Sequence, residues 1–363
     1  MSIIIFIVIL LVLVVSHEFG HFIVAKKSGI RVDEFSFGFP PKLFGKKIGE
    51  TTYNLNALPF GGYVKIFGEN GIDDNVSEED KKRSFTSKPR YIQAMVLFAG
   101  VVMNFLVAWL LLSVGFMSGL PSSVSMAPAG GNIQNQYLTI TSVSKGTPAE
   151  TSGLKSGDKL ISFKTINDHT ETPTAASVQY FIKKHANENI EIQVLRGPDT
   201  KVIAVTPVNN KEGNPAIGIA MDTIGTLKLP IHRAVWEGLK LTTDLTIGTF
   251  AGFYKLIAGA VTGTGDMSAV TGPIGIVGVV GDAAKFGFIY LLSFTALISV
   301  NLAVINLLPF PALDGGRLLF LAIEKIKGSR IKPEIANVVN MVGFGILMLL
   351  MVFITYNDII KLI

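Results

Sequence analysis

The sequence contains no cysteine among its 363 residues. This absence excludes disulfide bonds and metal sites built on thiolates, so any transition metal must be held by histidine and carboxylate side chains. Charged residues are also scarce, at 16% of the chain, where soluble proteins carry about 25%. Together with 49% hydrophobic residues and a mean hydropathy of +0.48, this composition indicates an integral membrane protein in contact with the lipid bilayer.

The net charge of +5 is small. Basic loops on the cytoplasmic face of a membrane explain it, and we expect no nucleic-acid partner. No basic residue precedes the apolar run at the N-terminus, and no small-residue cleavage pattern follows that run. We therefore expect the run to be retained as a membrane span and not removed as a signal peptide.

Four apolar stretches are long enough to cross a bilayer, whose hydrocarbon core requires about 20 residues of helix. They are residues 2–24, 94–119, 286–308 and 337–356. Lys and Arg are concentrated between the first and second stretches and between the third and fourth, which favours a cytoplasmic location for both loops. Residues 120–285 would then lie on the extracytoplasmic side.

Two parts of this extracytoplasmic segment differ in character. Residues 127–225 contain short alternating runs such as "IEIQVLR", separated by turns, together with one helical run, which predicts a small mixed α/β domain. Residues 226–285 include the stretch 231–262, whose five charged side chains favour a helix on the membrane surface, followed by a linker. The expected fold is a mainly α-helical membrane protein with an inserted domain.

The first apolar stretch carries polar side chains in the motif "HEFGH", residues 17–21. Histidines four positions apart share one face of a helix, so His17 and His21 can bind the same metal ion. Glu18 can reach a water on that metal and act as a base, and zinc is the natural ion. The alternative is a polar face packed on another helix, although ionisable groups inside a membrane are costly and usually functional.

A catalytic zinc site usually has three protein ligands. The remaining histidines fall in the extracytoplasmic segment, away from the cytoplasmic end of the first span: His169, His185 and His232. Asp314 instead follows the third span directly, after Pro309 and Pro311, which end or kink a helix. Because the residues of this stretch are also typical of turns, we expect a turn that presents a metal ligand next to His17 and His21.

With these pieces assembled, the chain resembles the site-2 protease family of intramembrane zinc metalloproteases over nearly its whole length. The resemblance rests on "HEFGH" at 17–21, "NALPFGGYVKIFGE" at 56–69, "GPIGI" at 272–276 and "NLLPFPALDGG" at 306–316. Within this family, the subgroup that the chain most resembles is the bacterial regulator of sigma-E protease. The resemblance implies a multi-pass protein of the bacterial inner membrane that cleaves single-span membrane proteins within the bilayer, such as anti-sigma factors or signal-peptide remnants, in regulated intramembrane proteolysis.

The resemblance also implies roles for individual residues. The implied zinc ligands are His17, His21 and Asp314. Glu18 would be the catalytic base, and Asn306 would contact the substrate backbone with Asn301 in a supporting role. The segment at about 51–66 would form a membrane-associated β-hairpin whose free edge binds an extended substrate, as strand addition requires. The alternative for this segment is an ordinary interfacial loop.

Residues 127–225 resemble a PDZ domain, through Gly153-Leu154 and Gly157-Asp158 in "KGTPAETSGLKSGDKLISFK". The chain has room for one such domain, where some relatives have two. A PDZ groove often binds a peptide terminus, and the alternative is a steric filter that keeps bulky substrates away. The implied domains are a membrane core at 1–120, the PDZ domain, a surface helix and linker at 226–285, and a second membrane core at 286–363.

Two rival interpretations stay open at this point. Other membrane zinc proteases take a glutamate from a later helix as third ligand, and the late candidates here are Glu237 and Glu324. Alternatively, the protein is not an enzyme but a membrane-anchored PDZ scaffold whose "HEFGH" motif is inert.

Overall fold

The computed structural model divides the chain into two compact units, Met1–Ser113 with Gly238–Ile363, and Val114–Glu237. The structure describes residues 1–69, 71, 76–125, 127–128, 131–210, 213–263 and 271–362. Parts of two predicted regions lie outside the described residues, namely 129, 130, 211 and 212 of the predicted PDZ domain and 264–270 of the predicted linker.

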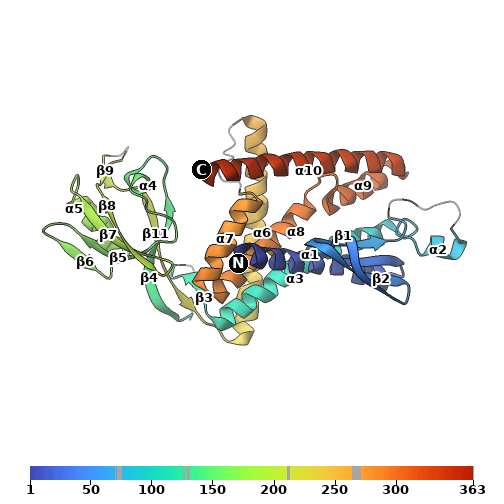
Figure 1. Ribbon diagram of the computed structural model, residues 1–363, viewed down its shortest axis with the longest axis horizontal. Helices are drawn as coiled ribbons and strands as arrows, with labels where there is room; N and C mark the ends of the chain where they lie inside the picture. The colour runs from blue at the N-terminus through green and yellow to red at the C-terminus, as the bar shows by residue number, and fades with distance from the viewer. Residues whose placement is uncertain are drawn as a thin grey trace. The chain divides into compact units, whose positions relative to one another are not determined.

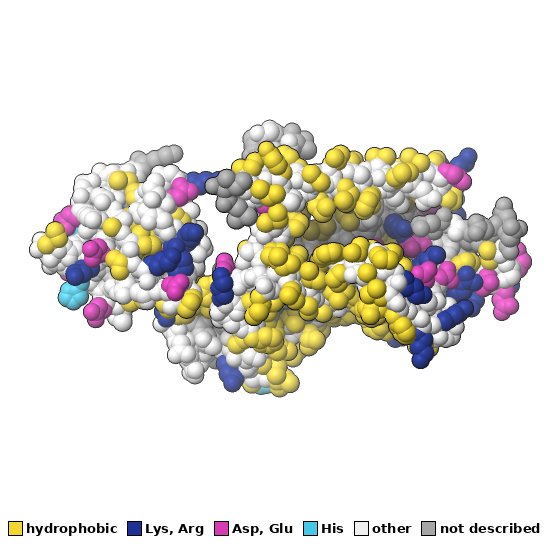
Figure 2. All heavy atoms as spheres, viewed as in Figure 1, with side chains coloured by type: hydrophobic (Ala, Val, Ile, Leu, Met, Phe, Trp, Pro, Cys, Tyr) yellow, Lys and Arg dark blue, Asp and Glu magenta, His cyan; other side chains and the backbone are white. Residues whose placement is uncertain are grey.

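Four long apolar helices dominate the first unit (Figure 1). They are α1 (Ser2–Lys27), α3 (Arg90–Ser118), α8 (Phe288–Leu307) and α10 (Pro333–Leu362). Within the described ranges, these four are the helices long and apolar enough to cross a membrane, which confirms the four predicted spans. Hydrophobic side chains cover the outer faces of α1 and α10, while charged side chains gather at the end of this unit that carries α2 (Glu78–Lys82) (Figure 2). Exposed apolar faces of this extent suit contact with lipid.

The boundary between α8 and α9 (Asp314–Lys327) follows from local chemistry. α8 ends two residues before Pro309, because proline lacks a backbone N–H and clashes with the preceding helical turn. A short connection then leads to Asp314 in the first turn of α9, where a negative charge stabilises the positive end of the helix dipole. Gly328 ends α9 with a φ of 79°, a left-handed conformation that glycine adopts without strain.

Two further helices pack against the long ones. α6 (Ile231–Thr262) coincides with the stretch predicted to lie on the membrane surface, a placement that stays a prediction. Its Leu241 and Leu245 pack against a buried cluster contributed by α3 and α8. α7 (Pro273–Phe286) packs on α1, where Val280 joins a cluster with Leu13.

Strands β1 (Val32–Ile48) and β2 (Thr51–Ile66) form the predicted hairpin, but the predicted bounds of about 51–66 are wrong. That range is a single strand, and the turn lies at Gly49, whose φ of 64° suits glycine. Sequence reasoning missed β1 because its two adjacent prolines and three lysines are typical of a loop and not of a strand interior.

The hairpin pairs in an unusual register that brings one edge of β2 to α1. Residues 34–37 of β1 face 62–65 of β2 on one side and 52–55 of β2 on the other. The end of β2 therefore forms an edge, and Val64 packs into the cluster that joins the hairpin to α1 and α3 through Ala25, Val32 and Val96. The same cluster receives side chains of α9, so hairpin, α1, α3 and α9 share one core.

The second unit is a mixed α/β domain, as the sequence predicted. Its described strands form a seven-stranded sheet in the order β3-β11-β4-β5-β7-β8, with β6 paired to β5. These strands are β3 (Leu120–Ser123), β4 (Ile133–Val143), β5 (Lys159–Lys164), β6 (His169–Glu171), β7 (Ile190–Arg196), β8 (Asp199–Val205) and β11 (Ile219–Leu227). The smaller elements are α4 (Pro148–Thr151), α5 (Ala175–Lys184), β9 (Val208–Asn209) and β10 (Pro215–Ala216). Phe163, Phe181 and Ile190 lie in its own hydrophobic core, which joins α5 to the sheet.

Candidate metal centre

The two histidines of α1 lie one helical turn apart and point to the same place. Their ring centroids are 4.7 Å apart, and the rings are nearly perpendicular. Nε2 of His21 lies 3.1 Å from Nε2 of His17, and both side chains are buried. The helical spacing therefore produces the shared face that the motif predicts.

Asp314, 297 residues further along the chain, completes the cluster. Its Oδ2 atom lies 3.0 Å from Nε2 of His17 and 3.2 Å from Nε2 of His21. Zinc bonds of about 2.0–2.2 Å in tetrahedral geometry hold neighbouring ligand atoms roughly 3.3 Å apart. The three atoms already have nearly this spacing, so the donor set fits a zinc ion. In the described part of the chain, this is the group of histidine and acidic side chains that could hold a metal.

The turn that presents Asp314 is fixed by its neighbours. Ala312 has a φ of 71°, and its N–H donates to Oδ1 of Asn340 on α10 at 3.2 Å. A Cβ atom at Gly315 would lie 2.2 Å from the carbonyl oxygen of Leu308. The backbone therefore comes very close to this glycine, and this contact locks the position of the carboxylate.

The second nitrogen of each imidazole also has a neighbour. Nδ1 of His21 lies 2.8 Å from the carbonyl oxygen of Val96. A carbonyl only accepts, so Nδ1 carries the proton and Nε2 keeps its lone pair for a metal. Nδ1 of His17 lies 3.4 Å from Nδ2 of Asn104. Both contacts come from α3, which sequence analysis did not assign to the site.

Helix α3 also presses directly on the histidine pair through a glycine. A Cβ atom at Gly100 would lie 2.4 Å from Nε2 of His21 and 2.6 Å from Cε1 of His17. At Gly20 of α1, a Cβ atom would lie 2.3 Å from the carbonyl oxygen of Ala99. The two helices can approach this closely only because both positions lack a side chain. A glycine in an apolar span gives no distinctive signal, whereas the polar Asn104 in the second span was a signal that could have been used.

Glu18 lies beside the cluster and faces the hairpin. Its Oε2 accepts the N–H of Val64 at 3.0 Å, which joins the carboxylate to the edge of β2. One step along an α-helix turns a side chain by about 100°. Glu18 is therefore displaced from the face of His17 and does not belong to the triad of ligand atoms.

The two predicted substrate-binding residues have different surroundings. Nδ2 of Asn306 lies 3.5 Å from Nε2 of His17, at the cluster. Nδ2 of Asn301 donates to the carbonyl oxygen of Leu297 in its own helix at 2.9 Å. Five residues of helix separate the two by about 140° of rotation. The structure thus brings Asn306, but not Asn301, to the ligand atoms.

Neither rival third ligand belongs to the cluster of His17, His21 and Asp314. Oε1 of Glu324 accepts the N–H of Ile331 at 2.9 Å. Glu237 belongs to the other compact unit, as do the three remaining histidines, His169, His185 and His232. The ring of His185 lies between Glu188 at 2.9 Å and Asp168 at 3.2 Å, with one carboxylate on each nitrogen.

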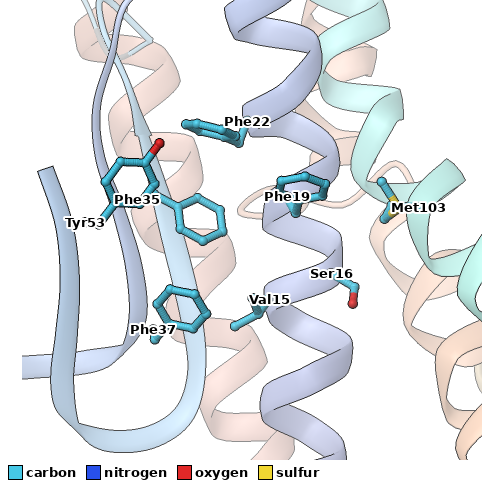
Figure 3. Close-up of a pocket in the computed structure, with 8 residues that line it drawn as sticks. All are labelled: Val15, Ser16, Phe19, Phe22, Phe35, Phe37, Tyr53 and Met103. Carbon is cyan, nitrogen blue, oxygen red and sulfur yellow. The ribbon is translucent and has the colours of Figure 1, made fainter. Parts of the chain in front are cut away.

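An apolar pocket of about 380 Å³ lies between α1, α3 and the hairpin (Figure 3). Its lining is Val15, Ser16, Phe19, Phe22, Phe35, Phe37, Tyr53 and Met103. Phe19 is about 200° around the helix from His17, so the pocket opens on the side of α1 turned away from the ligand atoms. It is suited to apolar groups and is not the metal site.

Comparison with known proteins agrees with this geometry. The family model described as "Peptidase family M50" matches residues 5–350. A Clostridium perfringens protein described as a candidate zinc metalloprotease is 36% identical over 348 residues, covering 96% of this chain and 95% of the relative. The regulator of sigma-W protease RasP of Bacillus subtilis is 30% identical over 437 aligned positions, covering 99% of both chains. The regulator of sigma E protease of Haemophilus influenzae is 29% identical over 449 aligned positions, covering 98% of both.

Proposed function

Because the chain belongs to peptidase family M50, the site-2 proteases, we propose that it cleaves single-span membrane proteins within the bilayer. It is a zinc metalloprotease, like the relatives that carry this name. One observation carries the proposal: ligand atoms from α1 and from the start of α9 lie within 4.8 Å of one another, beside helices long enough to span a membrane.

We assign His17, His21 and Asp314 as the zinc ligands and Glu18 as the catalytic base. A zinc ion held there would supply Lewis acidity at the scissile carbonyl and a bound water of lowered pKa. Glu18 takes the proton of the attacking water and returns it to the leaving amine. The N–H of Val64, which Glu18 accepts at 3.0 Å, orients the carboxylate for this transfer.

The substrate must unwind before its peptide bond can react, because a helix hides its backbone groups in internal hydrogen bonds. In lipid the released groups need new partners. Asn306 offers a side-chain amide beside His17, and the edge of β2 at 62–66 offers backbone groups next to Glu18. We assign both to the substrate backbone, with Asn301 supporting from α8. Two relatives are named "Regulator of sigma E protease" and "Regulator of sigma-W protease RasP". These names support anti-sigma factors as substrates beside signal-peptide remnants.

We place the protein in the bacterial inner membrane, with the basic loops in the cytoplasm and the domain at 127–225 outside. The active site then lies within the membrane near its cytoplasmic side, since His21 is close to the end of α1 that carries Lys26 and Lys27. This orientation follows the excess of Lys and Arg in cytoplasmic loops.

For the second unit we propose a PDZ domain that binds a peptide terminus. In the described sheet, β11 pairs with β4 from Ile219 to Leu227, but with β3 only from Ile224 to Leu227. The N–H of Val124 donates to the carbonyl oxygen of Thr223, so among the described residues the other edge of β11 is open over 219–222, on an element that also contacts α5. A free strand edge beside a helix is the geometry in which a peptide adds as an extra strand.

The proposal is tested with purified protein in detergent and a single-span model substrate. Wild type should bind one zinc ion per chain and cleave, whereas Glu18→Gln should retain zinc and lose cleavage. Proteomics of membrane fragments from cells with wild type or Glu18→Gln would then identify natural substrates. A wild-type protein that binds zinc but cleaves no membrane substrate would favour the scaffold interpretation. Full activity of Glu18→Gln would refute the assignment of Glu18 as the catalytic base.

A further inference from the structure

Asn104 is a fully buried amide in the middle of α3. Its Nδ2 atom lies 3.4 Å from Nδ1 of His17. In the part of the chain that is described, its Oδ1 atom is buried and has no hydrogen-bond partner. A buried carbonyl oxygen without a partner costs roughly 1–3 kcal/mol, so this arrangement calls for a physical reason.

The contact ties the tautomer of His17 to the orientation of the Asn104 amide. If Nδ2 of Asn104 donates, Nδ1 of His17 must be unprotonated, and Nε2 then carries the hydrogen. That hydrogen points to Oδ2 of Asp314 at 3.0 Å. In this tautomer Nε2 has no lone pair to offer, so His17 cannot bind a metal ion.

We propose that Asn104 is a positioning residue whose amide selects the tautomer of His17 according to metal occupancy. A half-turn of the amide exchanges Oδ1 and Nδ2, which have nearly the same shape. Oδ1 then accepts the Nδ1–H of His17, the orphaned oxygen gains a partner, and Nε2 is free to bind the ion. The inference rests on the proposed zinc site and adds a residue to it.

The two histidines differ in this respect. His21 faces the carbonyl oxygen of Val96, which accepts only and keeps the metal-binding tautomer at all times. His17 faces an amide, which can donate or accept. The backbone of Asn104 is itself held in place, because the buried Oγ of Ser299 donates to its carbonyl oxygen at 2.8 Å. The side-chain amide can therefore turn while its helix stays in place.

The substitutions that test the inference are Asn104→Leu, which removes the partner of Nδ1, and Asn104→Asp, which offers acceptors only. Loss of such a supporting partner typically weakens metal binding about 10- to 100-fold. We expect Asn104→Leu to weaken zinc binding by this factor, and Asn104→Asp to bind zinc at least as tightly as wild type. Ser113→Ala is the matched control, because Ser113 is a buried polar residue of α3 that bonds within its own helix at Trp109.

The measurement is zinc affinity of the full-length protein in detergent, by competition with a chromogenic chelator. The visible spectrum of the cobalt-loaded protein gives a second readout, since it reports the orientation of the ligands. Asn104→Leu should change that spectrum, and Asn104→Asp and Ser113→Ala should preserve it. Equal zinc affinity of wild type and Asn104→Leu would overturn the inference, and so would an Asn104→Asp protein that binds as weakly as Asn104→Leu. A wild-type protein without zinc affinity would instead refute the proposed metal site.

Discussion

Replacing Gly100 by alanine should displace the histidine pair and weaken zinc binding. The added Cβ atom would lie 2.4 Å from Nε2 of His21, where ordinary contact begins at 3.4 Å, so α3 or the imidazoles must move by about 1 Å. Metal–ligand distances tolerate deviations of only about 0.2 Å. A shift of this size therefore removes at least one ring from the position at which it can bind the ion.

The magnitude follows from the cost of adding a methyl group to a packed interior, about 1–3 kcal/mol. If the rings move and the helices do not, this free energy is taken from zinc binding, which corresponds to an affinity roughly 5- to 150-fold weaker. If the helices separate instead, the thermal midpoint falls and the zinc affinity changes little.

The assay is a zinc-competition titration and a thermal melt of the same preparation. Gly345→Ala is the matched control, since a Cβ atom there meets nothing within 4 Å in α10. It should retain zinc affinity and gain a little stability, because alanine favours a helix over glycine. If Gly100→Ala matched wild type in both measurements, the close contact of α3 with the histidine pair would be refuted.

Three further predictions address other parts of the molecule. Asp314→Ala should abolish stoichiometric zinc binding while Glu324→Ala retains it, and the opposite result would make Glu324 the third ligand. Asp358 of α10 accepts two backbone N–H groups at the start of α7, at 3.1 and 2.9 Å. Asp358→Ala should therefore lower the thermal midpoint, through a loss of about 1–3 kcal/mol, and an unchanged midpoint would contradict this. The hydrogen bond from Lys184 is the main cause that lowers the pKa of Asp168 from 3.8 to about 2. Because the folded pKa is the lower one, its stabilisation is present above about pH 4 and is lost as the pH falls through 2. Thermal melts should therefore show that Asp168→Asn destabilises the protein near neutral pH but not below about pH 2. An equal destabilisation at both pH values would contradict the lowered pKa of Asp168.

The four spans and the turn that presents Asp314 were predictable because their signals are local. Twenty consecutive apolar residues identify a span without knowledge of its neighbours. Pro309 and Pro311 end a helix wherever it lies, so the turn that presents Asp314 could be placed from the sequence alone.

The contacts made by α3 were not predictable in the same way. A helix that is apolar on all sides has no polar stripe to show which side faces its partner. The sequence therefore did not show that Gly100 faces the histidines, and the polar Asn104 was the one signal for the buried side of this helix. The strand β1 was missed for a related reason, since its partner β2 supplies the pairing and its own prolines argue against a strand.

The hydrogen bond from Val64 to Glu18 has a consequence for timing. One end of it belongs to the proposed catalytic base, and the other to the sheet edge where we propose that an extended substrate docks. An arriving strand that tilts or shifts this edge re-aims the carboxylate in the same motion. In the proposed mechanism, proton transfer is thereby tied to correct binding of the substrate.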